Sequence, residues 1–164
     1  MLNILKIVPD TIVDGPRMRT ALYLSGCFHG CPGCHNKESW KPWTGKNYEN
    51  DEVIQEIIKY DHNRLTISGG DGLCYQLSGL LEFLKELKIK LPTINIWLYT
   101  GYIWEDLKKD SERNQVLEFI DVLVDGKFEE NLKSKECLFR GSTNQRLIDV
   151  KKSLEEGKVI LYME

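Results

Sequence analysis

The distribution of apolar and polar residues predicts a chain in which strands and helices alternate. Short apolar runs bounded by turn-forming residues are typical of buried strands. The predicted strands cover 1–8, 20–24, 64–67, 93–99, 121–124 and, late in the chain, 159–162. Apolar residues at helical spacing predict the helices between them. The predicted helices begin at Asn50 as N-cap and at Trp104, and others cover 77–87 and 114–119. The segments 37–46 and 129–136 are expected to be irregular.

This alternation predicts an α/β fold built from βαβ units, with a mainly parallel sheet. Right-handed crossovers would curl such a sheet into part of a barrel. A complete eight-unit barrel needs about 250 residues, whereas this chain has 164. We therefore expect a partial (incomplete) βα barrel of mainly parallel strands. No internal repeat or linker divides the chain, so residues 1–164 are expected to form a single domain.

Composition and charge exclude several classes of partner. The chain has 22 Lys and Arg against 25 Asp and Glu, a net charge of −3, and no basic stripe that would bind nucleic acid. No apolar stretch reaches the ~18 residues of a membrane span, and the apolar start does not follow the pattern of a secretory signal. Five cysteines, three of them crowded together, argue against a disulfide framework. We expect a cytoplasmic protein without membrane or nucleic-acid partners.

Three of the cysteines form the strongest chemical signal. Cys27, Cys31 and Cys34 have the spacing Cys-x3-Cys-x2-Cys and directly follow the predicted strand 20–24. The glycines and the proline among them allow the backbone to curl around one metal centre. A [4Fe–4S] cluster normally takes four thiolates, so three local ligands would leave one iron open for a substrate or cofactor. Such a vacancy is typical of catalytic metal sites.

Spacing alone leaves a zinc site open as the alternative. A zinc knuckle would use the three thiolates and take His29, His35 or a distant cysteine as its fourth ligand. The two remaining cysteines, Cys74 and Cys137, are expected to be buried small apolar residues. His62 is expected at a helix end without a special task.

Two further sets of polar residues follow predicted strands. Ser68-Gly69-Gly70-Asp71 comes after 64–67, and Asp125-Gly126-Lys127 after 121–124. Paired glycines let backbone groups approach a ligand, and an aspartate suits a ligand with an ammonium group. Because parallel strands end at one edge of a sheet, both sets are expected beside the cysteine loop. Ordinary turns are the alternative for both sets, and the position after a predicted core strand is what favours a ligand site at residues 68–71.

The cysteine loop resembles that of the radical S-adenosylmethionine (SAM) enzymes. Its fuller string, Gly-Cys-x-His-x-Cys-Pro-Gly-Cys-x-Asn over 26–36, resembles one branch, the activating proteins of anaerobic ribonucleotide reductase. The strings 121–128 and 139–146 resemble signatures of the same branch, and Asp14-Gly15-Pro16 is similar to a segment of glycyl-radical activating enzymes. The resemblance covers most of the chain, with its motifs in the expected order.

The resemblance implies two cofactors and a set of residues that hold them. A [4Fe–4S] cluster would be bound by Cys27, Cys31 and Cys34, and its open iron would be chelated by SAM. The residues that would contact SAM are Gly33, Cys34, His35, Gly69, Gly70, Asp71, Asp125 and Lys127. Gly33 stands where many relatives have an aromatic residue, so the ring of His35 and the local backbone would lie near adenine instead.

Two departures affect the predicted binding of the SAM amino group, which the family's Gly-Gly-Glu-Pro segment holds. Asp71 replaces the glutamate and reaches less far, and Gly72 replaces the proline and loosens the turn. The segment 140–146 offers two arginines with amide and hydroxyl groups. It would hold either SAM or the backbone of a partner, and the sequence does not choose between them.

By this resemblance the chain is an oxidoreductase that cleaves SAM reductively. An electron donor such as flavodoxin would reduce the cluster, and the resulting 5′-deoxyadenosyl radical would take hydrogen from a glycine of the large subunit of anaerobic ribonucleoside-triphosphate reductase. No side chain need act as acid, base or nucleophile, because the cluster and SAM carry the chemistry. The alternatives are an activase of another glycyl-radical enzyme, such as pyruvate formate-lyase, and a zinc-binding interaction module.

Overall fold

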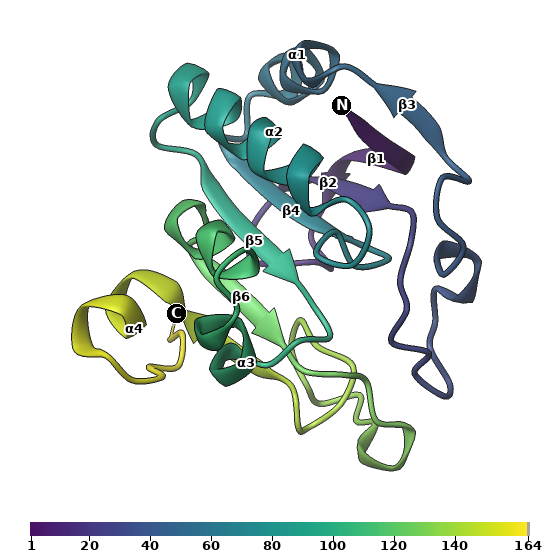
Figure 1. The fold of residues 1–164 in the computed structure, drawn as a ribbon, viewed down its shortest axis with the longest axis vertical. Helices are drawn as coiled ribbons and strands as arrows, with labels where there is room; N and C mark the ends of the chain where they lie inside the picture. Colours follow the sequence, from purple (N-terminus) through teal and green to yellow (C-terminus); the bar gives the residue numbers. More distant parts are fainter. Residues whose placement is uncertain (164) are drawn as a thin grey trace.

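The computed structural model of the protein describes residues 1–163, which form a seven-stranded sheet with helices packed on it (Figure 1). The strand order is β3-β1-β2-β4-β5-β6-β7. The strands are β1 (Leu2–Thr11), β2 (Arg19–Leu24), β3 (Lys46–Tyr48), β4 (Arg64–Gly69), β5 (Asn95–Tyr99), β6 (Val122–Asp125) and β7 (Arg146–Asp149). The four middle strands, from β2 to β6, are parallel, whereas β1, β3 and β7 are antiparallel to their neighbours. The expected parallel sheet is therefore confined to the middle of the fold.

Helices connect the parallel strands, as the alternation predicts. The α-helices are α1 (Asn50–Tyr60), α2 (Leu77–Lys90), α3 (Trp104–Lys109) and α4 (Val150–Glu156), and the 3₁₀ helices are η1 (Lys37–Ser39), η2 (Arg113–Phe119) and η3 (Glu130–Leu132). The N-cap of α1 is Glu49 and not Asn50, because Glu49 and Glu52 form a reciprocal capping box. The second segment after β5 is a 3₁₀ helix over 113–119.

Four elements differ from those expected. Residues 159–162 do not form a strand; Leu161 contributes only an isolated bridge to Ile148. The strand β3 lies at the end of a segment expected to be irregular, and it completes the sheet edge by pairing with β1. The strand β7 and the helix α4 were not predicted, and they add an antiparallel edge beside β6.

The alternation of side chains along the strands divides the core between the two faces of the sheet. Leu65 and Ile67 of β4 belong to the main core, which α1 and α2 cover. On the other face, Trp97 of β5 belongs to a second cluster with Phe139 and Tyr162 from the C-terminal part of the chain. This second face has only loop segments over it near the carboxyl ends of the strands, and this leaves room for a cavity there.

The sheet is open, since β3 and β7 are its two edges. The curvature of a partial barrel stays a prediction. Within residues 1–163, no helix combines the length and the apolar character needed to cross a membrane.

Candidate metal and cofactor site

The carboxyl ends of β2, β4, β5 and β6 meet at one edge of the sheet, and the predicted site residues follow them (Figure 1). The cysteine loop, which we define as residues 25–36, leaves β2. Asp71 follows β4, Gly101 follows β5 and Lys127 follows β6. The topology thus brings together loops that are up to about a hundred residues apart in the sequence, which is the arrangement that parallel α/β folds use for ligand sites.

The two glycines at the end of β4, Gly69 and Gly70, hold the base of the cysteine loop. The backbone N–H of Gly70 donates to Leu24 O at 2.8 Å, and that of Asp71 donates to Gly26 O at 2.9 Å. A Cβ on Gly69 would lie 2.6 Å from Leu24 N, and one on Gly70 would lie 2.6 Å from Gly26 O. Glycine is therefore required at both positions because two backbones approach each other closely.

The carboxylate of Asp71 joins three loops at this edge. Its Oδ2 accepts hydrogen bonds from Thr100 Oγ1 at 2.7 Å and Gly101 N at 2.9 Å, and it lies 2.7 Å from His29 Nε2. Its Oδ1 accepts from Leu73 N at 2.9 Å. The side chain is 3% exposed. Asp71 thus fixes the imidazole of His29, a contact that no local sequence signal predicted because the two residues are 42 positions apart.

The three motif cysteines lie together on the cysteine loop. All are free and half-buried. Burial raises the pKa of Cys31, and the neighbouring Cys27 and Cys34 raise that pKa further, as expected for thiols that are close in space. A four-iron cube binds each cysteine through a different iron, so its ligands need not converge on one point. The donor set of three thiols on a glycine-rich loop fits such a cluster.

A fourth thiol lies beside the first motif cysteine. Ligand atoms of Cys27, His29 and Cys74 lie within 4.8 Å of one another, and Cys74 Sγ is 3.6 Å from His29 Nε2. A hydrogen bond with Cys74 lowers the pKa of Cys27 to about 7 and raises that of Cys74. The expectation that Cys74 and Cys137 are buried apolar residues is wrong: both are half-buried, and Cys74 belongs to a polar cluster.

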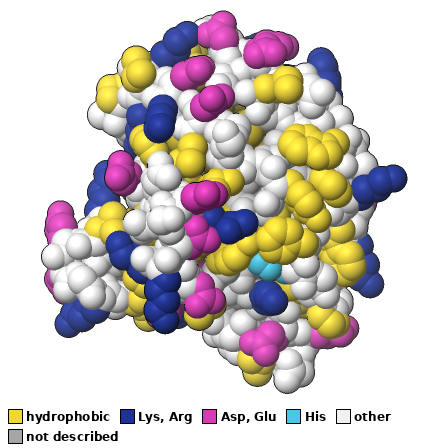
Figure 2. Space-filling view, in the orientation of Figure 1, with side chains coloured by type: hydrophobic (Ala, Val, Ile, Leu, Met, Phe, Trp, Pro, Cys, Tyr) yellow, Lys and Arg dark blue, Asp and Glu magenta, His cyan; other side chains and the backbone are white. Residues whose placement is uncertain are grey.

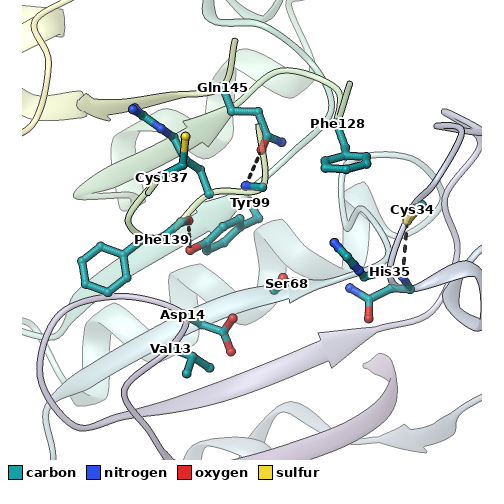
Figure 3. A pocket seen from close by; sticks show the side chains of 13 residues that line it. Val13, Asp14, Cys34, His35, Ser68, Tyr99, Phe128, Cys137, Phe139 and Gln145 are labelled. Atoms are coloured by element: carbon teal, nitrogen blue, oxygen red, sulfur yellow. Dashed lines mark hydrogen bonds between the residues drawn. The ribbon is translucent and has the colours of Figure 1, made fainter. Parts of the chain in front are cut away.

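A cavity of about 370 Å³ lies between the cysteine loop and residues 137–145 (Figure 3). Cys34 and His35 form one wall, while Cys137 and Phe139 lie across from them. The ring of His35 lies 5.6 Å from that of Phe128, with 56° between the ring planes. On the far wall, Tyr99 Oη donates to Phe139 O at 2.5 Å, and this bond holds the 137–145 segment over the sheet.

Arg140 also lines this cavity and carries an unsatisfied group. Its Nε is buried and has no hydrogen-bond partner among the described residues. Buried polar groups normally have partners, and a guanidinium prefers a carboxylate or phosphate. Because Arg140 lines it, the cavity beside Cys34 suits a ligand with an anionic group, and the carboxylate of SAM is such a group.

A second cavity, of about 860 Å³, lies on the other side of the cysteine loop. Cys31, His29 and Lys127 line it, and Phe128 lines both cavities. Lys127 forms no salt bridge within residues 1–163, and its charge counteracts the raised pKa of Cys31. Hydrophobic side chains gather on the face seen in Figure 2, with a histidine beside them. The exposed ring of Phe28 contributes to the apolar wall of this cavity.

The predicted cofactor residues thus fall into three groups: those that line the first cavity, those that line the second, and those that line neither. Cys34 and His35 line the first cavity and Lys127 the second. The other predicted cofactor residues, Gly33, Gly69, Gly70, Asp71 and Asp125, line neither of these two cavities.

Asp125 is fully buried and is held by protein groups. Its carboxylate accepts hydrogen bonds from Arg146, at 2.6 Å and 3.1 Å, and from Trp104 N at 2.9 Å. Of the two arginines in the 140–146 segment, therefore, Arg146 is engaged with Asp125 and Arg140 is the one that faces a cavity.

Comparison with known proteins identifies the family. The family model described as "4Fe-4S single cluster domain" matches residues 13–148. The chain is 37% identical over 150 residues to the anaerobic ribonucleoside-triphosphate reductase-activating protein of Pasteurella multocida, an alignment that covers 88% of this chain and 95% of that protein. The chain belongs to the family of anaerobic ribonucleoside-triphosphate reductase-activating proteins.

Other members of this family match over similar lengths. The protein of the same name from Escherichia coli K12 is 35% identical over 150 residues, with 88% of this chain and 96% of that protein covered. The one from Enterobacteria phage T4 is 37% identical over 153 residues, with 89% and 93% covered. The region matched by the 4Fe–4S model contains all three motif cysteines. Family membership thus favours the iron–sulfur interpretation of the cysteine loop over a zinc-binding interaction module.

Proposed function

We propose that this chain activates anaerobic ribonucleoside-triphosphate reductase by forming a glycyl radical on its large subunit, as an iron–sulfur enzyme that uses SAM. The observation that carries the proposal is the position of the three-thiol cysteine loop. It leaves the end of a parallel strand beside a cavity that Arg140 lines. A metal centre and a site for an anionic ligand are therefore adjacent, as an enzyme that chelates SAM on its cluster requires.

Cys27, Cys31 and Cys34 would hold the cluster. When bound, the cluster and SAM together supply a carbon-centred radical that can take hydrogen from a glycine. The share of this chain is to hold the loop rigidly and to restrict water around it. Asp71 holds the loop rigidly, because its carboxylate connects His29 to the ends of β4 and β5 through hydrogen bonds of 2.7–2.9 Å.

The first cavity is the proposed place for SAM. Arg140 would pair with the carboxylate, and the ring of His35, with the backbone from Gly33 to Cys34, would lie near adenine. Lys127 would add a second positive charge from the other side of the loop, next to Cys31. A guanidinium or ammonium that pairs with a carboxylate in a partly dry site contributes roughly 1.5–3 kcal/mol.

Gly69, Gly70, Asp71 and Asp125 would support SAM binding indirectly. The two glycines pack against the backbone of the cysteine loop, and both carboxylates already accept hydrogen bonds from protein donors. We propose that Asp71 and Asp125 are positioning residues, which set the loops after β4 and β6.

We also propose that the open sheet curves into the partial barrel of radical SAM enzymes, with the first cavity on its concave side. The target glycine of the reductase would enter from the rim, where Val13 is 70% exposed. An external donor such as flavodoxin would supply the electron.

The test is to reduce the reconstituted chain without oxygen, using dithionite or flavodoxin, and to add SAM with the reductase. Electron paramagnetic resonance should detect a glycyl radical on the reductase. The signal should vanish with Cys34→Ala, and with a reductase whose target glycine is replaced by alanine. A parallel sample with pyruvate formate-lyase covers the alternative activase. A radical on that enzyme and none on the reductase would overturn the proposal.

A further inference from the structure

Cys27, a proposed cluster ligand, also belongs to a compact set of metal-binding side chains with His29 and Cys74. Their ligand atoms lie within 4.8 Å of one another, and Cys74 stands outside the Cys-x3-Cys-x2-Cys motif. Two ligands of one tetrahedral zinc ion, each about 2.0–2.3 Å away, lie about 3.5–3.8 Å apart. The 3.6 Å between Cys74 Sγ and His29 Nε2 already matches this spacing, and a shift of about 1 Å or less would bring all three donors onto a single ion.

The imidazole in this set is held in place from several sides. Its Nε2 lies 2.7 Å from Asp71 Oδ2, and the side chain is 5% exposed. The ring of Tyr102 packs edge-on against it at 4.9 Å. A Cβ on Gly101 would lie 2.5 Å from His29 Cδ2, so the glycine leaves the space that the ring occupies. The ring therefore keeps its place beside the two thiols, and zinc would replace Asp71 as the partner of Nε2.

We propose that the cluster-free chain binds one zinc ion through Cys27, His29 and Cys74, and that this zinc site and the iron–sulfur cluster exclude each other. Two thiolates and one imidazole are a common zinc donor set. Water would complete the tetrahedron as the fourth ligand. A single ion needs converging donors, whereas a cube needs each thiolate on its own iron.

The exclusion follows from Cys27, which both sites require. This part of the inference rests on the proposed role of Cys27 as a cluster ligand, whereas zinc binding itself does not. A zinc ion held by Cys27 and Cys74 would withdraw one of the three thiolates from cluster assembly. Zinc would then delay reconstitution of the cluster, and bound cluster would prevent zinc from entering.

The experiment measures zinc and cobalt binding to the full-length, cluster-free chain under anaerobic, reducing conditions. Zinc affinity is determined by competition with a chromophoric chelator. Cobalt reports the donors, because two thiolates in a tetrahedral site give thiolate-to-cobalt charge transfer with strong visible bands. The variants are Cys74→Ser, Cys34→Ser and, as a matched control, Cys137→Ser, whose thiol lies in the first cavity. Iron and sulfide are counted in parallel after reconstitution.

We expect one zinc per chain, and an affinity that falls at least about 100-fold in Cys74→Ser but stays within about twofold in Cys34→Ser and Cys137→Ser. Cluster content should show the opposite pattern: lost in Cys34→Ser, retained in Cys74→Ser. Zinc binding that survives Cys74→Ser and is lost in Cys34→Ser would overturn the proposal, because the ion would then use the cluster thiols. Failure of the wild-type chain to bind zinc would overturn it as well.

A second measurement does not depend on any variant. Wild-type chain loaded with one zinc should assemble its cluster several-fold more slowly than the metal-free chain, and zinc should appear in solution as iron is taken up. Simultaneous full occupancy by zinc and cluster would refute the exclusion. Because all these readouts concern bound metal, they remain valid even if the chain fails to activate the reductase.

Discussion

Arg146 on β7 binds the buried carboxylate of Asp125 at the end of β6 through two hydrogen bonds, from Nε to Oδ1 at 3.1 Å and from Nη2 to Oδ2 at 2.6 Å. The same guanidinium donates to Glu105 Oε2 of α3 at 2.8 Å. The pair therefore fixes the loop after β6 to the antiparallel edge strand and to α3. Since Lys127 follows Asp125 by two residues, this ion pair also sets the position of a proposed SAM contact.

Replacing Arg146 with methionine should destabilise the fold by about 3 kcal/mol, because it leaves the Asp125 carboxylate buried with only the Trp104 N–H as partner. Urea unfolding of the cluster-free chain measures this. The control is Lys151→Met, whose ammonium binds Asp121 at 2.9 Å but is 69% exposed, and which should cost less than about 1 kcal/mol. Equal losses of unfolding free energy in the two variants would mean that the buried Arg146–Asp125 pair stabilises the fold no more than an exposed ion pair does.

The strand that carries Arg146 also shows where sequence reasoning stopped. Residues 146–149 follow a stretch rich in glycine, serine and asparagine, and the short run Arg-Leu-Ile-Asp has too few apolar residues to predict a strand by itself. The strand forms because its backbone pairs with β6 from Arg146 opposite Asp125 to Asp149 opposite Val122. Such pairing is a tertiary effect. By contrast, the apolar runs of β2, β4 and β5 carry their own signal and were predicted to within a few residues.

The candidate site likewise contains some features that the sequence predicts and others that only the fold brings about. Cys27, Cys31 and Cys34 could be predicted as one centre because their spacing is local. The contacts of His29 with Asp71, and of Cys74 with Cys27, join positions more than forty residues apart and have no pattern in the sequence. The carboxylate of Asp71 was expected to face a ligand, but three neighbouring donors take it up in the fold.

Alanine at Cys27, Cys31 or Cys34 should each abolish the cluster, because two thiolates cannot hold a four-iron cube with one open corner. Iron and acid-labile sulfide per chain, after anaerobic reconstitution, measure the result. Cys137→Ala and Cys74→Ala are the matched controls and should leave cluster content nearly intact. Loss of iron in either control, together with a normal iron content in Cys27→Ala, would show that this assignment of the cluster ligands is wrong.

Lys127→Met and Asp71→Ala should both weaken SAM binding, but for different reasons. Lys127 lines the second cavity and would act on SAM only through its charge, so its loss should lower the affinity about two- to fivefold without changing the stability of the chain. Asp71 fixes His29 and two loops, so its loss should lower both SAM affinity and the free energy of unfolding. Equilibrium binding to the reconstituted chain, alongside urea unfolding, separates the two effects. Unchanged SAM affinity in both variants would remove these residues from the site.

Arg140→Met should lower SAM affinity about 10- to 100-fold, because the guanidinium that lines the first cavity would pair with the SAM carboxylate. The informative comparison is with methionine and 5′-deoxyadenosine as competing ligands. Only methionine carries the carboxylate, so the variant should lose affinity for methionine and keep it for the nucleoside. If the variant binds methionine and 5′-deoxyadenosine as tightly as the parent chain does, Arg140 contacts the partner protein and not SAM.

SAM cleavage should depend on the partner, because the first cavity does not enclose its ligand. Its rim includes the 70%-exposed Val13, and the segment that covers it, residues 137–145, is itself partly exposed. A radical formed there would be quenched by solvent or by the chain, unless the glycine loop of the reductase fills the opening. The measurement is 5′-deoxyadenosine formed per chain by the reduced protein alone, with the reductase, and with a reductase whose target glycine is alanine. Coupled turnover should require the intact reductase, since only its glycine offers the hydrogen atom at contact distance. Equal product in all three samples, with no radical on the reductase, would show that the cavity closes without the partner and that the reductase is not the substrate.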